Sequence, residues 1–167
     1  DTDDEAELGT AVPDAARVKE NMYKLMPGKQ YTKDPTVHID ANSEACWVFV
    51  KVTNPISDIE DDAVYGKGSG TIADQVTAFG WTELEGATNE ENTKVYYLNH
   101  SAKQTTVKDY VVFEAFKLIG DGLVNGNAPS SQNPAGTLKY IGDYNSKTIT
   151  VTAYAIQNAG FEGTDND

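Results

Sequence analysis

Residues 25–53 read LMPGKQYTKDPTVHIDANSEACWVFVKVT, and this stretch decides the fold. Pro27 and Gly28 suit the two central positions of a type II turn, because proline presets φ and glycine tolerates positive φ. The alternation after it predicts a short strand at Thr36–Asp40, with its two apolar side chains facing inward. A polar turn then leads into the most apolar strand of the chain, Ala45–Thr53. We interpret the stretch as the first hairpin of a β-sandwich.

The second strand of this hairpin carries the strongest burial signal. Six of the seven residues from Cys46 to Val52 are apolar, and Lys51 is the exception. A run of this kind is typical of a strand that is buried on both faces or nearly so. No residue in it indicates catalysis, and Cys46 is expected to be a small buried hydrophobe rather than a nucleophile.

Length and charge limit the classes of function. The chain has 167 residues, enough for one domain with a sizeable core. Thirteen basic residues against 26 acidic ones give a net charge of −13. This balance argues against a nucleic-acid partner and against binding to an anionic membrane surface. A single cysteine excludes an intramolecular disulfide, and no apolar run approaches the roughly 20 residues of a membrane span.

The N-terminal segment DTDDEAELGTAV is acidic at first and then alternates. Ala6, Leu8, Thr10 and Val12 fall on one side of an extended chain, which predicts a strand that pairs with another element. The alternative is a solvated terminus, and the pattern alone leaves both open. Pro13 ends the segment, because proline cannot donate to a sheet ladder. The chain starts at Asp1 without an initiator methionine or signal peptide, as a processed protein would and as a trimmed one also would.

Further along, one helix interrupts the strands. It is predicted at Thr71–Phe79, with Thr71 as the N-cap and Gly80 as the stop. Long polar or glycine-rich loops are expected at residues 56–70 and 120–136. The remaining strands are predicted at residues 94–100, 110–119, 138–141 and 147–157, the last with Ile149, Val151, Ala153 and Ala155 facing the core. The fold class is therefore all-β, a jelly-roll-type two-sheet sandwich with one short inserted helix and long loops.

The search for chemistry finds no catalytic constellation. His38 and His100 lie in no H-E-x-x-H motif, and neither G-x-S-x-G nor a phosphate-binding glycine loop is present. The acidic residues of the first long loop lack EF-hand spacing and are expected to be solvated. We expect no catalytic residue, no metal site and no cofactor. Four aromatic residues could line a sugar site but fit core packing better: Trp81, Tyr96, Tyr97 and Tyr110.

The segment YKLMPGKQYTKDPTVHIDANSEACWVFVKV, residues 23–52, resembles the front end of the TasA/camelysin family. The likeness continues in IADQVTAFGWTELEG (residues 72–86), in KVYYLN, and in the closing ITVTAYAIQNAGF (residues 149–161). These are exported proteins of Gram-positive bacteria that are matured by a SipW-type signal peptidase. The most specific parts are the core P-G-x-x-x-x-K-D-P-T-V and the ending A-Y-A-x-Q, taken together.

The resemblance implies a secreted jelly-roll subunit of an extracellular filament, either a biofilm-matrix fibre or a pilus-like structure. Subunits would join by donor-strand complementation, in which the N-terminal strand of one completes the sheet of the next. Residues 1–13 would then be the donor segment, 14–161 the domain and 162–167 an acidic tail. The donor side chains would be Ala6, Leu8, Thr10 and Val12, with the aspartates of the tip solvated.

The implied partners are further copies of the chain and other matrix components, with no nucleic acid and no membrane in the mature form. Some relatives are described as metalloproteases, but the chain lacks a zinc motif, so that activity is not expected. The alternative to a fibre subunit is a monomeric secreted surface or carbohydrate-binding module.

Overall fold

The computed structural model describes residues 21–64, 68–100, 106–128 and 138–158. These residues form ten short strands and one α-helix, which makes the fold all-β, as predicted. The donor residues Ala6, Leu8, Thr10 and Val12 lie outside the described residues.

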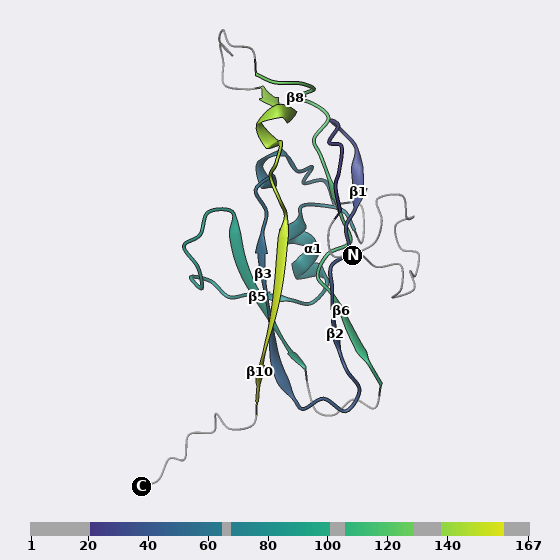
Figure 1. The fold of residues 1–167 in the computed structure, drawn as a ribbon, viewed down its shortest axis with the longest axis vertical. Helices are drawn as coiled ribbons and strands as arrows, with labels where there is room; N and C mark the ends of the chain where they lie inside the picture. The colour runs from purple at the N-terminus through teal and green to yellow at the C-terminus, as the bar shows by residue number, and fades with distance from the viewer. Residues whose placement is uncertain (1–20, 65–67, 101–105, 129–137, 159–167) are drawn as a thin grey trace.

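The largest sheet has four strands in the order β10-β3-β5-β4, all antiparallel. Its two central strands are β3 (Cys46–Thr53) and β5 (Thr93–His100), and β4 is the two-residue strand Thr82–Glu83. Strand β10 (Thr150–Gln157) pairs with β3 over its whole length, from Thr150 opposite Thr53 to Gln157 opposite Cys46. Figure 1 shows these strands crossing the molecule along its long axis.

A second layer consists of two long antiparallel segments. Strand β1 (Gln30–Thr32) pairs with β7 (Ala115–Lys117), and β2 (Thr36–Ile39) pairs with β6 (Lys108–Val111). Backbone hydrogen bonds between the pairs make the run nearly continuous: Lys33 N–H donates to Glu114 O at 3.0 Å, and Val112 N–H donates to Pro35 O at 2.8 Å. On the far side of β7, Glu60 forms an isolated bridge with Leu118.

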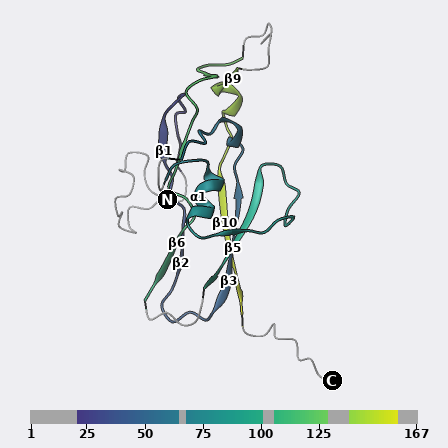
Figure 2. The same cartoon turned by 180° about the vertical axis from the view of Figure 1, so that it is seen from behind.

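The third region is a small cap at one end of the molecule. The two-residue strands β8 (Leu123–Val124) and β9 (Lys139–Tyr140) pair in parallel, and the 3₁₀ helix η3 (Ile141–Tyr144) follows. A second 3₁₀ turn, η2 (Ser57–Ile59), interrupts the loop that was expected at residues 56–70. Figures 1 and 2 place β8, β9 and η3 at the opposite end from the last residues of β10.

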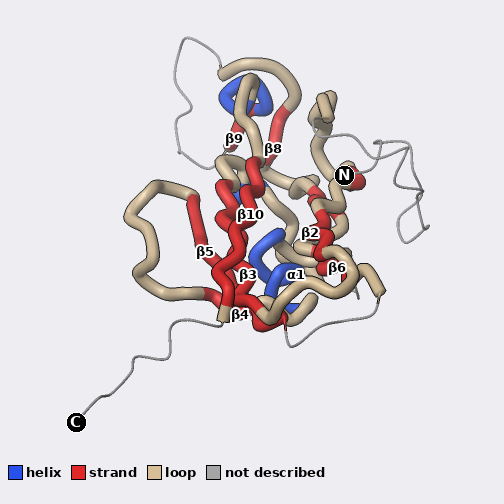
Figure 3. Tube along the Cα trace, turned by 60° about the horizontal axis from the view of Figure 1, so that its bottom comes forward, coloured by secondary structure: helices blue, strands red, loops and turns tan. Residues whose placement is uncertain are grey.

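Helix α1 (Ile72–Ala78) begins at the residue that the sequence predicted. Thr71 accepts a hydrogen bond from Asp74 N–H at 3.2 Å, and the Asp74 carboxylate accepts from Thr71 N–H at 3.1 Å, which completes a capping box. Gly80 follows with φ +91°, a conformation that suits glycine. In Figures 1 and 3 the helix lies between the four-stranded sheet and the second layer.

Buried apolar side chains from both layers and the helix form one core. Trp81 is buried in it, and its indole N–H donates to Val111 O at 2.8 Å. The largest fully buried side chains are Trp81, Tyr31, Tyr96, Phe113, Phe116, Ile59, Ile72 and Leu118. Trp81 and Tyr96 are therefore core residues, as the sequence predicted in preference to a sugar site.

Two burial predictions were wrong. Strand β3 is fully buried on one face only. Cys46, Val48, Val50 and Val52 are buried, whereas Trp47 on the other face is 39% exposed. On its other face Phe49, Lys51 and Thr53 are half-buried. The acidic loop is not wholly solvated either, because Glu60 is 7% exposed.

Gln75 is a buried polar residue that holds the helix against the second layer. Its Oε1 accepts from the N–H groups of Glu114 (3.1 Å) and Ala115 (3.2 Å). Its Nε2 donates to Ala115 O at 2.8 Å and to Gly70 O at 3.2 Å. The side chain thus satisfies the backbone between β6 and β7, where the strand pairing is interrupted.

Removing this amide should destabilise the fold. We expect Gln75→Ala to lower the free energy of unfolding by about 3 kcal/mol, because buried backbone groups lose their partners. Urea denaturation followed by tryptophan fluorescence measures the change. Thr77→Ala on the exposed side of the same helix is the control and should change stability by less than about 1 kcal/mol. Equal effects of the two substitutions would contradict this role of Gln75.

Candidate functional site

The outer edge of β10 is the most unusual feature of the described chain. β10 is eight residues long and pairs with β3 alone, so no strand of the described residues bonds to its other edge. A long strand edge with free N–H and C=O groups is a template for pairing with another chain. No proline or charged residue interrupts it.

The core-facing side of β10 is also partly exposed. Ala153 pairs with the buried Val50, and Ala155 pairs with the buried Val48, so these alanines share the core side of the sheet. Both alanines are nevertheless exposed, whereas Ile149 and Val151 are half-buried and pack against the core. The prediction that all four face the core is therefore confirmed for Ile149 and Val151, which pack against it, and wrong in burial for the two alanines. The second layer does not extend over this part of β10.

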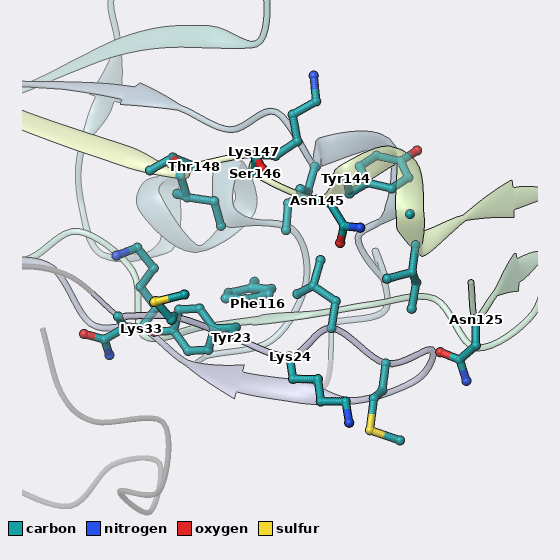
Figure 4. A pocket seen from close by; sticks show the side chains of 18 of the residues that line it. Tyr23, Lys24, Lys33, Phe116, Asn125, Tyr144, Asn145, Ser146, Lys147 and Thr148 are labelled. Atoms are coloured by element: carbon teal, nitrogen blue, oxygen red, sulfur yellow. The ribbon is translucent and has the colours of Figure 1, made fainter. Parts of the chain in front are cut away.

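A groove opens beside the start of β10, with a volume of ≈ 870 Å³. One wall is the segment that leads into β1, which includes Tyr23–Met26, and the other is the connection from η3 into β10, Asn145–Ile149. Figure 4 shows Phe116 and Tyr23 inside the opening. The groove therefore lies between the two layers.

Aromatic contacts and two hydrogen bonds fix the first wall. The Tyr31 and Phe116 rings stack with centroids 4.9 Å apart, and Tyr23 meets Phe116 edge-on at 5.3 Å. The Tyr23 hydroxyl donates to Thr32 O at 2.7 Å, and the Tyr31 hydroxyl donates to Lys24 O at 2.7 Å. These contacts hold the lead-in segment along β1.

The second wall depends on a close backbone approach. Gly142 N–H in η3 donates to Gly126 O at 2.8 Å, and a Cβ at Gly142 would clash with the Asn127 side-chain oxygen. Only glycine fits there without displacing its neighbour. Tyr144 donates its hydroxyl to Asp58 Oδ2 at 2.7 Å, and Lys139 forms an ion pair with the same oxygen at 3.1 Å. Burial acts to raise the pKa of Asp58, but these hydrogen bonds outweigh it and the pKa lies below its ordinary value.

Three lysines stand around the groove: Lys24, Lys33 and Lys147. Figure 4 shows them on three sides of the opening, with their ammonium groups directed away from Phe116. Lys24 and Lys147 are exposed, while Lys33 is half-buried. Burial lowers the pKa of Lys33 below its ordinary value, and the neighbouring Asp34 acts in the opposite direction.

The chemistry-bearing residues that the sequence singled out lie away from this groove. His38 Nδ1 lies 2.6 Å from Asp109 Oδ1 on the surface of the β2–β6 pair, and His100 Nδ1 lies 2.8 Å from the Tyr110 hydroxyl. Cys46 is buried, and burial raises the pKa of its thiol. Among the described residues, no three His, Cys, Asp or Glu side chains are grouped so that they could hold a metal ion.

Comparison with known proteins finds no relative. No family model matches the chain, and no curated protein or solved structure matches it either. Within the described part of the chain, no helix is long and apolar enough to cross a membrane. The function has to be argued from the edge of β10 and the groove beside it. The groove was missed from sequence because its walls come from segments more than a hundred residues apart.

Among the described residues, Glu60 is the carboxyl whose pKa is most strongly shifted. Its oxygens accept from Ile72 N–H at 3.1 Å and from the Asn54 side chain at 2.8 Å. Burial raises the pKa of Glu60 to about 7, and the two hydrogen bonds lower it less than burial raises it. This carboxyl joins the end of β3 to the start of α1.

The raised pKa predicts that Glu60 makes stability depend on pH. Because the folded chain holds the proton more tightly, the contribution is full below pH 4.5 and is lost as pH rises through 7, a change of about 3 kcal/mol at most. Unfolding free energies at pH 5 and pH 8 should therefore differ less in Glu60→Gln than in the unmodified chain. The control is Glu90→Gln, which removes the same charge from an exposed ion pair. An unchanged pH dependence in Glu60→Gln would contradict the assignment.

Proposed function

We propose that the chain is a structural subunit of an extracellular filament and that it polymerises by donor-strand complementation. The observation that carries this proposal is the eight-residue free edge of β10, with Ala153 and Ala155 uncovered on the core side. An added strand would bond to this edge and cover both alanines. The N-terminal segment, with Ala6, Leu8, Thr10 and Val12 on one side, has the alternation that such a strand needs.

Geometry and chemistry fit this assembly. A donor strand that inserts into the next subunit of the filament makes a head-to-tail contact. Such a contact does not close into a ring, so it generates a filament. With the added strand between them, the four-stranded sheet and the second layer would form the jelly-roll-type sandwich. The resemblance of residues 23–52 to the TasA/camelysin family supports the same assembly and, with it, secretion to the cell surface or matrix. The fibre role requires no catalytic residue.

Deleting the donor tests the proposal. We expect the full chain to form filaments visible by negative-stain electron microscopy, and a version without residues 1–12 to remain monomeric. Acidification relieves repulsion between subunits of charge −13, so both proteins are compared at neutral and mildly acidic pH. Filaments from both versions would exclude the N-terminal segment as the donor, and monomers from both would contradict the fibre role.

A point substitution tests the acceptor edge. Ala153→Arg should abolish filaments while leaving the melting temperature of the monomer nearly unchanged, because the residue is exposed until a donor covers it. Thr152→Arg adds the same charge on the outer face of the same strand and should still assemble. Sedimentation and electron microscopy at equal protein concentration compare the two. Normal assembly of Ala153→Arg would place the acceptor edge elsewhere.

One observation favours a second candidate, a carbohydrate-binding module. The outer face of the four-stranded sheet exposes Trp47 (39%), Tyr154 (56%) and Ile156 (45%) around the half-buried Tyr97. The Trp47 and Tyr97 rings meet edge-on at 5.7 Å, and aromatic rings on a sheet face suit stacking on sugar rings.

If this face binds polysaccharide, Trp47→Ala should weaken binding about tenfold, as loss of an aromatic anchor does. Affinity electrophoresis in gels that contain cell-wall or matrix polysaccharides measures the change. Leu84→Ala, another exposed apolar residue, is the control. Equal migration of the unmodified chain with and without polysaccharide would rule this function out.

A further inference from the structure

The groove beside β10 is basic in a strongly acidic protein. The chain carries twice as many acidic as basic residues, yet the described residues that line the groove include three lysines and no aspartate or glutamate. Lys24 comes from the segment before β1, Lys33 from the link between β1 and β2, and Lys147 from the connection into β10. Three separate segments thus bring positive charge to one opening. A cleft lined by one sign of charge attracts a ligand of the opposite sign.

The floor of the same groove is apolar. Its apolar lining residues include Tyr23, Leu25, Ile56, Phe116, Ile141 and Ile149. The aromatic members pack on one another, so the floor is held in place without a ligand. A groove with an apolar floor and a cationic rim suits an extended segment that alternates apolar and acidic side chains.

The N-terminal segment has this pattern. Acidic residues occupy positions 1, 3, 4, 5 and 7, and the apolar side chains of Ala6, Leu8 and Val12 follow on one side. The first described residue, Asn21, itself lines the groove, so the 20 residues before it are attached close to this opening. At roughly 3.3 Å per residue they can span about 66 Å, enough to leave one subunit and enter the next.

We propose that the lysine-rimmed groove receives the acidic residues 1–5 of a second copy of the chain, so that the donor strand enters at the start of β10 and runs parallel to it. This inference rests on the proposed filament function and adds to it the direction of the donor and the groups that select it. Residues 6–12 would then follow the free edge of β10 over about 23 Å, and β10 itself extends about 26 Å.

The opposite direction would place like charges together. Asn158 N–H, just after β10, donates to Ala45 O at 2.9 Å, so the end of β10 lies beside the turn that follows β2. Asp40 and Glu44 flank that turn and are exposed. An acidic donor tip at this end would meet carboxylates, whereas at the start of β10 it meets ammonium groups. Charge pairs of this kind fix register and direction more than they add affinity.

Cross-linking tests the direction in the full chain. Two double variants are made in a Cys46→Ala background: Asp3→Cys with Thr148→Cys at the start of β10, and Asp3→Cys with Gln157→Cys at its end. On mild oxidation the first should give a ladder of disulfide-linked multimers and the second should not. Multimers from the second double variant alone would overturn the proposed direction of the donor strand. So would the absence of multimers from both variants under conditions where filaments form. Mixing copies that carry two different tags shows whether the disulfide joins two copies or lies within one. A disulfide that lies within one chain would overturn the assignment of the groove to a second copy.

Charge reversal tests the role of the lysines. Lys24→Glu with Lys147→Glu should raise the protein concentration needed for filaments about tenfold. The control is Lys51→Glu with Lys94→Glu, which makes the same charge change on the four-stranded sheet, where these lysines pair with Glu90 and Glu83. Adding Asp3→Lys and Asp4→Lys to the groove variant should restore assembly. No difference between the groove variant and its control would overturn the inference and leave the filament proposal standing.

A peptide separates the two proposals. A fluorescent peptide of residues 1–12 should bind the full chain, with an affinity that falls at high salt and in the groove variant but not in the control. If the chain never forms filaments but the peptide still binds in this lysine-dependent way, the filament function fails and the groove assignment stands. Tighter binding of a peptide of the acidic tail, residues 162–167, would assign the groove to the other end of the chain and overturn the inference.

Discussion

The pairing of β3 with β5 on one edge and β10 on the other is the constraint on which the rest of the structure depends. Eight residues of β3 match eight residues on each side, and a shift of one residue would turn its buried valines toward solvent. This register sets which side of β10 faces the core. Since the second layer stops short of that side, the sheet ends in an edge that is long, uncharged and unpaired with any other described strand.

Natural sheets protect such edges with charges, prolines, bulges or covering loops. The described β10 has none of these within its eight residues, and its small core-side alanines leave room for an incoming strand. The net charge of the chain also opposes unspecific association, because copies of net charge −13 repel each other. For the exposed edge to pair with another copy of the chain, a selective contact has to overcome this repulsion. The lysines around the neighbouring groove supply attraction where the edge begins, which would favour the chain's own acidic segment over unrelated strands.

Local signals in the sequence predicted the helix and the longer strands. The hairpin expected at residues 25–53 was wrong, because β2 pairs with β6 while β3 pairs with β5 and β10. The capping residues around α1, the Pro-Gly turn and the alternation in β2 act within a few residues, so their outcome hardly depends on distant contacts. Burial was predicted less well. An apolar run such as residues 46–52 is equally consistent with a strand buried on both faces and with one that exposes an aromatic face. Glu60 appeared to belong to a solvated acidic loop, and only the positions of Asn54 and Ile72 show why it is buried.

The sequence by itself therefore determined the all-β class, the place of the helix, the acidity of the surface and the pattern of the N-terminal segment. These follow from composition and from periodicities that the backbone imposes over a few residues. Only the tertiary structure decided that β10 is an edge among the described strands, that Ala153 and Ala155 are exposed, and that Lys24, Lys33 and Lys147 surround one groove. The physical reason is that an edge and a groove are defined by segments far apart in the chain, and no local pattern records which strand lacks a neighbour.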